Sequence, residues 1–79
     1  MSEEKAIGKQ YETRAKNILK AELKRRGITY KGLAELLTAR GVSENERNLT
    51  NKISRGSFTT AFFLMCMDVI GAGSLQLEA

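Results

Sequence analysis

One segment near the end of the chain constrains the fold more than any other feature. Between residues 60 and 70, apolar side chains occupy almost every position. A helix that is apolar on every side must be buried on every side. The chain has 79 residues, which is one domain. We therefore expect this helix to be central, to form a dimer contact, or both, and the side chains assigned to a homodimer contact are Phe62, Phe63, Met65 and Met67.

The remaining chain favours helices as well. It contains no proline, and its apolar residues recur at spacings of three and four, as in Tyr11, Ala15, Ile18 and Leu23. A composition of 42% hydrophobic and 28% charged residues argues against intrinsic disorder. The fold class predicted is all-α. The helical domain is expected over residues 9–71, between a disordered or frayed N-terminus (1–8) and a C-terminal tail (72–79).

Capping residues and glycines set the predicted helix bounds. The third helix has a Ser-x-x-Glu capping box, in which Glu46 follows Ser43 by three residues. In chain order we expect a helix over residues 9–26 ended by Gly27, a second capped by Thr29 and ended by Gly41, a third capped by Ser43 and ended by Gly56, and a fourth over residues 60–70 capped by Thr59 and ended by Gly71.

The residue inventory argues against an enzyme, a metal site or a cofactor. The chain has no histidine, the side chain best suited to proton exchange near neutral pH. The single cysteine, Cys66, cannot form an internal disulfide or a cysteine-based zinc site. The polar, acidic start is unlike a signal peptide, and the longest apolar stretch, residues 61–67, is far below the ~20 residues of a membrane span. We expect a cytoplasmic protein with no membrane segment.

Positive charge is concentrated in the first part of the chain. The formal net charge is +4, yet residues 5–31 hold nine Lys or Arg against two Glu, a local charge of +7. A basic face on a small domain is typical of proteins that bind nucleic acid. The alternative is that these side chains only solvate helix surfaces.

Short motifs make the comparison more specific. The run Ile28-Thr29-Tyr30-Lys31-Gly32-Leu33-Ala34 resembles the second helix of λ-repressor-like domains. The run Ile53-Ser54-Arg55-Gly56 is similar to the end of the recognition helix in that family, and Thr59 with the apolar residues after it resembles the following helix. The resemblance implies a compact four- to five-helix λ-repressor-like (XRE-type) helix-turn-helix domain that binds DNA.

A narrower resemblance covers about two thirds of the chain. Residues 18–71, above all residues 47–56 and 61–64, resemble a small bacterial family catalogued only as a domain of unknown function. That family implies the repressor-like fold, but it has no assigned activity.

The spacing departs from the standard motif in one place. Between Ala34 and Ile53 lie roughly six more positions than usual, and we expect about three in the turn and three at the start of the third helix. The added residues include Glu44 and Glu46, whose carboxylates would repel phosphates at the end of the helix that normally reads bases.

Two groups of residues are candidates for DNA contact. Arg binds guanine and Asn binds adenine through paired hydrogen bonds, and a helix start attracts phosphate. The alternative is a polar helix face in water. The base-contact candidates are Arg47, Asn48, Asn51 and Lys52, and the phosphate-contact candidates are Thr29, Tyr30, Lys31 and Arg55.

Two functions follow from these features. The first is a small regulator of transcription that binds double-stranded DNA with its third helix, as a homodimer through the fourth or the N-terminal helix. The second is a protein-interaction module on the same helical fold, with no role for nucleic acid.

Overall fold

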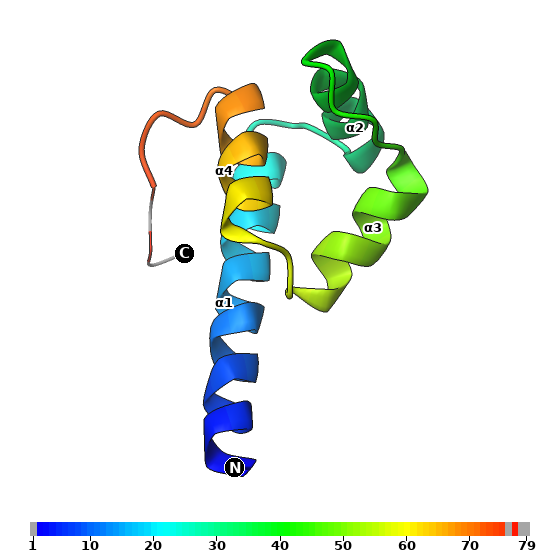
Figure 1. Ribbon diagram of the computed structural model, residues 1–79. Helices are drawn as coiled ribbons and strands as arrows, with labels where there is room; N and C mark the ends of the chain where they lie inside the picture. The colour runs from blue at the N-terminus through cyan, green and yellow to red at the C-terminus, as the bar shows by residue number, and fades with distance from the viewer. Residues whose placement is uncertain (1, 76, 78–79) are drawn as a thin grey trace.

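The described part of the chain is entirely helical. The computed structural model describes residues 2–75 and 77. Within them the chain forms four helices and no strand, which confirms the all-α prediction (Figure 1). In chain order the helices are α1 (Ser2–Arg25), α2 (Tyr30–Ala39), α3 (Glu46–Arg55) and α4 (Thr60–Val69).

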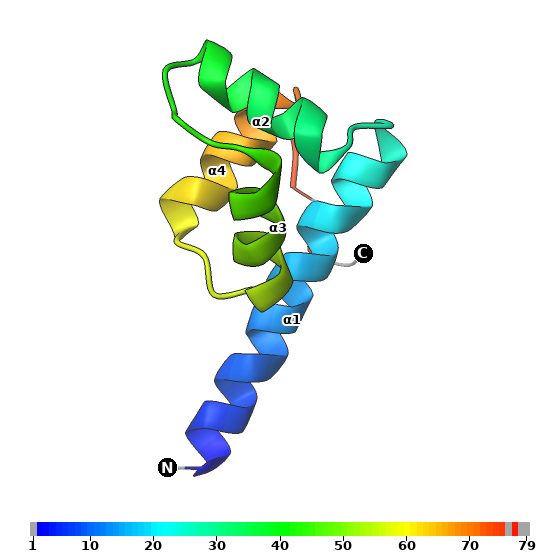
Figure 2. The same ribbon diagram turned by 90° about the vertical axis from the view of Figure 1, so that its right-hand side faces the viewer.

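The four helices form a small body with one long arm. Helices α1 and α2 each pack against both α3 and α4. Helix α1 has 24 residues against 10 in each of the others, so its N-terminal half extends beyond them (Figures 1 and 2). The molecule measures 41 × 23 × 18 Å for this reason. All four helices contribute to one core, whose fully buried members include Leu19, Leu33, Leu37, Leu49, Ile53 and Cys66.

One side of helix α4 faces solvent, so the helix is not buried on every side within its own chain. It packs against α1 and α2. Leu64 is 58% exposed and Met65 is 37% exposed. Phe62 and Met67, by contrast, are buried in the core of their own chain. Of the four side chains predicted to form a dimer contact, these two are therefore the least accessible, and the dimer contact itself stays a prediction.

Most of the predicted helix boundaries are confirmed. The side chains of Thr29 and Thr59 accept hydrogen bonds from the backbone N–H groups of Gly32 and Phe62, each at 3.0 Å. Helices α1, α2 and α4 all end in the paired backbone hydrogen bonds of a Schellman motif. In α1 these run from Gly27 N–H to the Lys24 carbonyl and from Ile28 N–H to the Leu23 carbonyl.

Helix α1 begins earlier than predicted. It starts at Ser2 instead of residue 9, so residues 2–8 are helical; residue 1 lies outside the described residues. Glu3 and Glu4 in the first turn interact favourably with the positive end of the helix dipole. Gly8 inside the helix costs only about 1 kcal/mol relative to alanine. A glycine alone was too weak a signal to place the helix start.

The described part of the tail returns along the body. Beyond α4, residues 72–75 and 77 have no regular structure. The Arg14 side chain donates a hydrogen bond from Nη2 to the Leu77 carbonyl at 3.1 Å, which ties the tail to α1. Residues 76, 78 and 79 of the predicted tail lie outside the described residues.

Helix α3 begins later than predicted, and the capping box is wrong. Its cap is Asn45, whose Oδ1 accepts a hydrogen bond from the Asn48 N–H at 2.8 Å. Asn caps a helix at least as well as Ser does, and Asn45 directly precedes the first residue of α3, so Asn45 is the cap instead of Ser43. Six residues, 40–45, then connect α2 to α3. Residues 43–45 therefore lie in this connection and not in the helix.

Gly56 fixes the position of the last turn of α3 against α1. It is buried, and its backbone φ of 73° lies in the left-handed region, which residues other than glycine rarely adopt. A Cβ at this position would lie 2.7 Å from the Glu12 carbonyl oxygen in α1. Residue 56 must therefore be glycine for two separate reasons, conformation and contact.

These two reasons can be separated by comparing Gly56→Ala with Gly27→Ala. Gly27 has a similar φ of 67°, but nothing lies within 4 Å of its Cβ position. Gly27→Ala should cost about 1–2 kcal/mol of unfolding free energy for the left-handed conformation alone. Gly56→Ala should cost roughly 1–3 kcal/mol more, because backbone atoms of α1 must move. Urea unfolding followed by circular dichroism measures both, and equal losses would contradict the close contact.

Candidate nucleic-acid interface

Helix α3 presents a polar, cationic side to solvent. Leu49 and Ile53 turn its opposite side into the core. Successive residues of a helix are 100° apart around its axis, which places Arg47, Asn51 and Arg55 on the side opposite Leu49 and Ile53. All three are exposed, as is the neighbouring Asn48. In Figure 2, α3 lies on the side of the molecule that faces the viewer, between α1 and α4. We call Arg47, Asn48, Asn51 and Arg55 the outer face of α3.

Lys52 does not belong to this outer face. Its ammonium donates a hydrogen bond to Oε2 of Glu44 at 2.6 Å and lies 4.9 Å from the centre of the Phe62 ring. The side chain therefore points along the flank of α3 toward the core and the connection from α2. The structure brings together three of the four predicted base-contact residues, and it holds Lys52 in an ion pair.

Glu44 is the partner that holds Lys52. Its side chain is only 6% exposed, whereas that of Lys52 is 44% exposed. One of its oxygens, Oε1, is buried without a hydrogen-bond partner. A buried carboxylate needs a compensating charge, so Lys52 is the group that makes this burial tolerable. Of the two acidic residues expected near the start of α3, only Glu46 is exposed.

The predicted phosphate contacts lie in two places. Thr29, Tyr30 and Lys31 are at the start of α2, where backbone N–H groups point outward. The Thr29 hydroxyl oxygen is occupied as the helix cap. Burial raises the pKa of Tyr30, so its phenol stays protonated and able to donate a hydrogen bond. Arg55 lies on α3, where its Nε donates to the Asn51 carbonyl at 3.2 Å.

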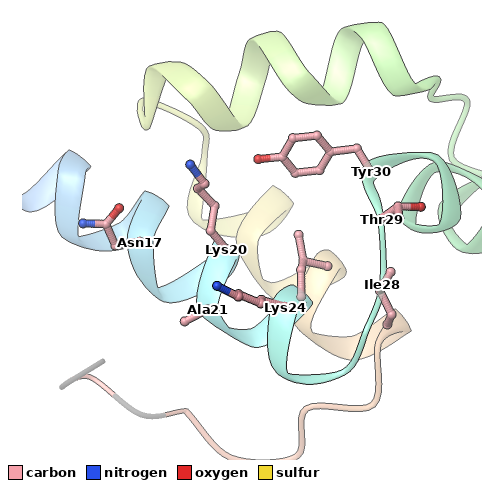
Figure 3. A pocket seen from close by; sticks show the side chains of 8 residues that line it. Asn17, Lys20, Ala21, Lys24, Ile28, Thr29 and Tyr30 are labelled. Atoms are coloured by element: carbon pink, nitrogen blue, oxygen red, sulfur yellow. The ribbon is translucent and has the colours of Figure 1, made fainter.

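A groove between α1 and the start of α2 adds cationic side chains that the sequence analysis did not assign. Figure 3 shows Lys20 and Lys24 along one side of it and Tyr30 across it, with the Tyr30 hydroxyl directed toward Lys20. Asn17 lies at its end, and Leu23 and Ile28 give it an apolar floor.

The lysines of this groove continue to α3. Lys16 precedes Lys20 by one helical turn, and its Nζ is 3.5 Å from the Ser54 carbonyl in the last turn of α3. Lys16, Lys20 and Lys24 follow one another at intervals of four. We call them the α1 lysine row. That interval is visible in the sequence and was the signal that could have identified them.

Two other basic side chains near the end of α1 have structural partners. Glu22 is almost fully buried, and its carboxylate accepts hydrogen bonds from Arg25 at 2.8 Å and Arg26 at 3.3 Å. The last turn of α1 therefore divides its cations. Arg25 and Arg26 neutralise a buried carboxylate, whereas Lys24 lines the groove.

The described residues hold no group of three or more side chains able to bind a metal ion. The Cys66 thiol is buried, and burial, followed by the charge of Glu44, raises its pKa to about 12. A protonated, buried thiol packs as an apolar side chain and is a poor nucleophile. In the part of the chain that the structure describes, no helix is long and apolar enough to cross a membrane.

The arrangement defines a small all-helical domain with a cationic surface. The chain belongs to the family described as "Domain of unknown function (DUF6471)", whose model matches residues 11–75. This confirms the resemblance to a family of unknown function. No curated protein and no solved structure matches the chain.

The ion pair between Lys52 and Glu44 gives a prediction about stability. Lys52→Met keeps most of the aliphatic stem but leaves the buried Glu44 carboxylate without a cation. We expect a loss of about 2 kcal/mol or more in unfolding free energy. Thermal and urea unfolding measure this loss.

The matched control is Arg40→Met. Arg40 pairs with Asp68 at 2.9 Å, but both side chains are largely exposed. Exposed ion pairs contribute only about 0–1 kcal/mol. The double variant Glu44→Leu with Lys52→Met should recover most of the loss, since no buried charge remains. Equal costs for Lys52→Met and Arg40→Met would show that the burial of Glu44 is unimportant.

Proposed function

We propose that this chain is a small DNA-binding protein with a λ-repressor-like helix-turn-helix, formed by α2 and α3. In this arrangement α3 enters the major groove and the start of α2 meets the phosphate backbone. The observation that carries the proposal is the outer face of α3. It gathers two arginines and two asparagines on the side opposite the core, and they are all exposed.

The chemistry of this face suits direct reading of bases. Arg47 offers a planar guanidinium that matches O6 and N7 of guanine, and Asn48 and Asn51 offer amides that match N6 and N7 of adenine. The arrangement of the acidic residues supports the same proposal. Glu44 is turned away and paired, and Glu46 lies well to the side of the outer face, so phosphates meet little repulsion there.

The α1 lysine row supports phosphate contact beside the major groove. Lys16 reaches the last turn of α3, and Lys20 lies across the groove from Tyr30 at the start of α2. Cations and hydroxyl donors from two elements therefore border the outer face of α3. Phosphate contacts of this kind fix the orientation of a protein on a duplex, while base contacts provide the sequence preference.

A protein-interaction module on the same fold is the second candidate. It is favoured by exposed apolar side chains on α4, where Leu64 is the most exposed. In that case α3 would contribute only a solvated polar surface. A DNA titration separates the two candidates, because only the first gives salt-sensitive changes at α3.

The outer face is tested with Arg47→Ala and Asn51→Ala. Each should lower affinity for a preferred duplex about tenfold or more, since each removes a paired hydrogen bond to a base, a contact that contributes about 1–3 kcal/mol. Lys9→Ala is the control for Arg47→Ala, because it removes one positive charge from the exposed N-terminal half of α1. The duplex is selected from a random library, and affinity is measured by fluorescence anisotropy.

An amide-resolved NMR titration with the same duplex shows which residues contact the DNA. Shifts should concentrate in residues 29–33 and 46–55 and fade as salt rises. If the shifts spread evenly over α1, or if Lys9→Ala weakens binding as much as Arg47→Ala, the docking of α3 is wrong. An absence of any shift up to millimolar duplex would favour the interaction module.

The lysine row makes a separate prediction about salt. Lys20→Ala should weaken binding to all duplexes alike and reduce the slope of log affinity against log salt by about 0.9, the value for one lost phosphate contact. Asn51→Ala, a neutral change, should leave the slope unaltered. An unchanged slope for Lys20→Ala would remove the α1 lysine row from the interface.

A further inference from the structure

The projecting half of α1 carries a stripe of exposed side chains. Every residue from Glu3 to Tyr11 is exposed. Ile7 and Tyr11, one turn apart, are 53% and 59% exposed, and Glu4 and Arg14 continue the same stripe at intervals of three. Spacings of three, four and three place all four side chains on one side of a helix. We call Glu4, Ile7, Tyr11 and Arg14 the α1 stripe.

The stripe joins a groove at the point where α1 enters the body. Tyr11 and Arg14 line this groove together with Phe58 and Phe63, whose rings stack with centres 6.1 Å apart. The Arg14 guanidinium lies 5.3 Å from the centre of the Tyr11 ring. Arg14 is therefore held over the stripe, between its own Tyr11 and the Leu77 carbonyl, with further N–H groups free to donate.

We propose that the α1 stripe binds the α1 stripe of a second copy of this chain, in antiparallel orientation. A two-fold axis beside residue 9 places residue i of one copy opposite residue 18 − i of the other. Ile7 then meets Tyr11 of the second copy, and Glu4 meets Arg14. The two-fold symmetry repeats each contact, so the interface has two apolar contacts in its centre and one ion pair at each end.

Charge complementarity is the reason for choosing a second copy as the occupant. The stripe has an acid at one end and a base at the other, with apolar side chains between them. A sequence of this kind is complementary to itself when reversed, as a two-fold interface requires. A parallel pair would place Glu4 against Glu4 and Arg14 against Arg14, which repel each other.

Charge also makes α1 better suited to this role than α4. Leu64 and Met65 of α4 are exposed as well, but Asp68, the charged residue of α4, already pairs with Arg40 of its own chain. The stripe is short, so the dimer belongs with the weak, concentration-dependent class of interfaces. The outer face of α3 lies on other residues, and the dimer does not depend on DNA binding.

The test is sedimentation equilibrium of the full chain without DNA, from about 10 μM to 1 mM. The wild type should show a monomer–dimer equilibrium. Glu4→Arg and Arg14→Glu should each weaken the dimer about tenfold or more, because each places like charges opposite one another twice. The double variant Glu4→Arg with Arg14→Glu restores both pairs with reversed polarity and should return the dissociation constant to within about threefold of wild type.

Lys9→Glu is the matched control for Arg14→Glu, because it reverses a charge in the same way on the exposed side of α1 opposite the stripe. It should weaken the dimer much less than Arg14→Glu does. A wild type that stays monomeric throughout the concentration range would overturn the proposal. So would a dimer that Glu4→Arg does not weaken, or one that the double variant does not restore. Circular dichroism of each variant shows whether the fold is retained, and DNA affinity is measured separately.

Discussion

The contact between Gly56 and the α1 backbone at Glu12 is the constraint on which the arrangement of the helices depends. It brings the last turn of α3 directly onto the middle of α1, closer than any side chain would permit. With that end fixed and Leu49 and Ile53 in the core, the rotation of α3 about its axis is determined. Arg47, Asn51 and Arg55 must then face solvent. The same contact brings Lys16 within reach of the Ser54 carbonyl, so α1 and α3 share one cationic surface.

Buried carboxylates divide the basic residues into two groups. Glu22 engages Arg25 and Arg26, and Glu44 engages Lys52. These cations compensate for burial. Among the described residues, the cations without such a partner include Arg47 and Arg55 on the outer face of α3 and the α1 lysine row. A net charge of +4 therefore says little by itself, since the distribution of the acids decides which bases can bind phosphate.

Local signals predicted much of the fold. Thr29 and Thr59 were recognised as caps, and Gly27, Gly41 and Gly71 as helix ends, because capping depends on residues within one turn. Prediction was weaker where two local signals competed. Ser43 with Glu46 and Asn45 both offer a cap for α3, and the structure uses Asn45.

The sequence by itself determined the helical class, most helix ends and the polar character of the outer face of α3. These follow from hydrogen bonding and periodicity over a few residues, which nearby side chains settle. Only the tertiary structure decided that Lys52 turns to Glu44, that Phe62 and Met67 are internal, and that the α1 lysine row borders α3. These outcomes depend on which distant groups meet in the core. A charge or an apolar side chain becomes available or buried only when another helix, far along the chain, packs against it.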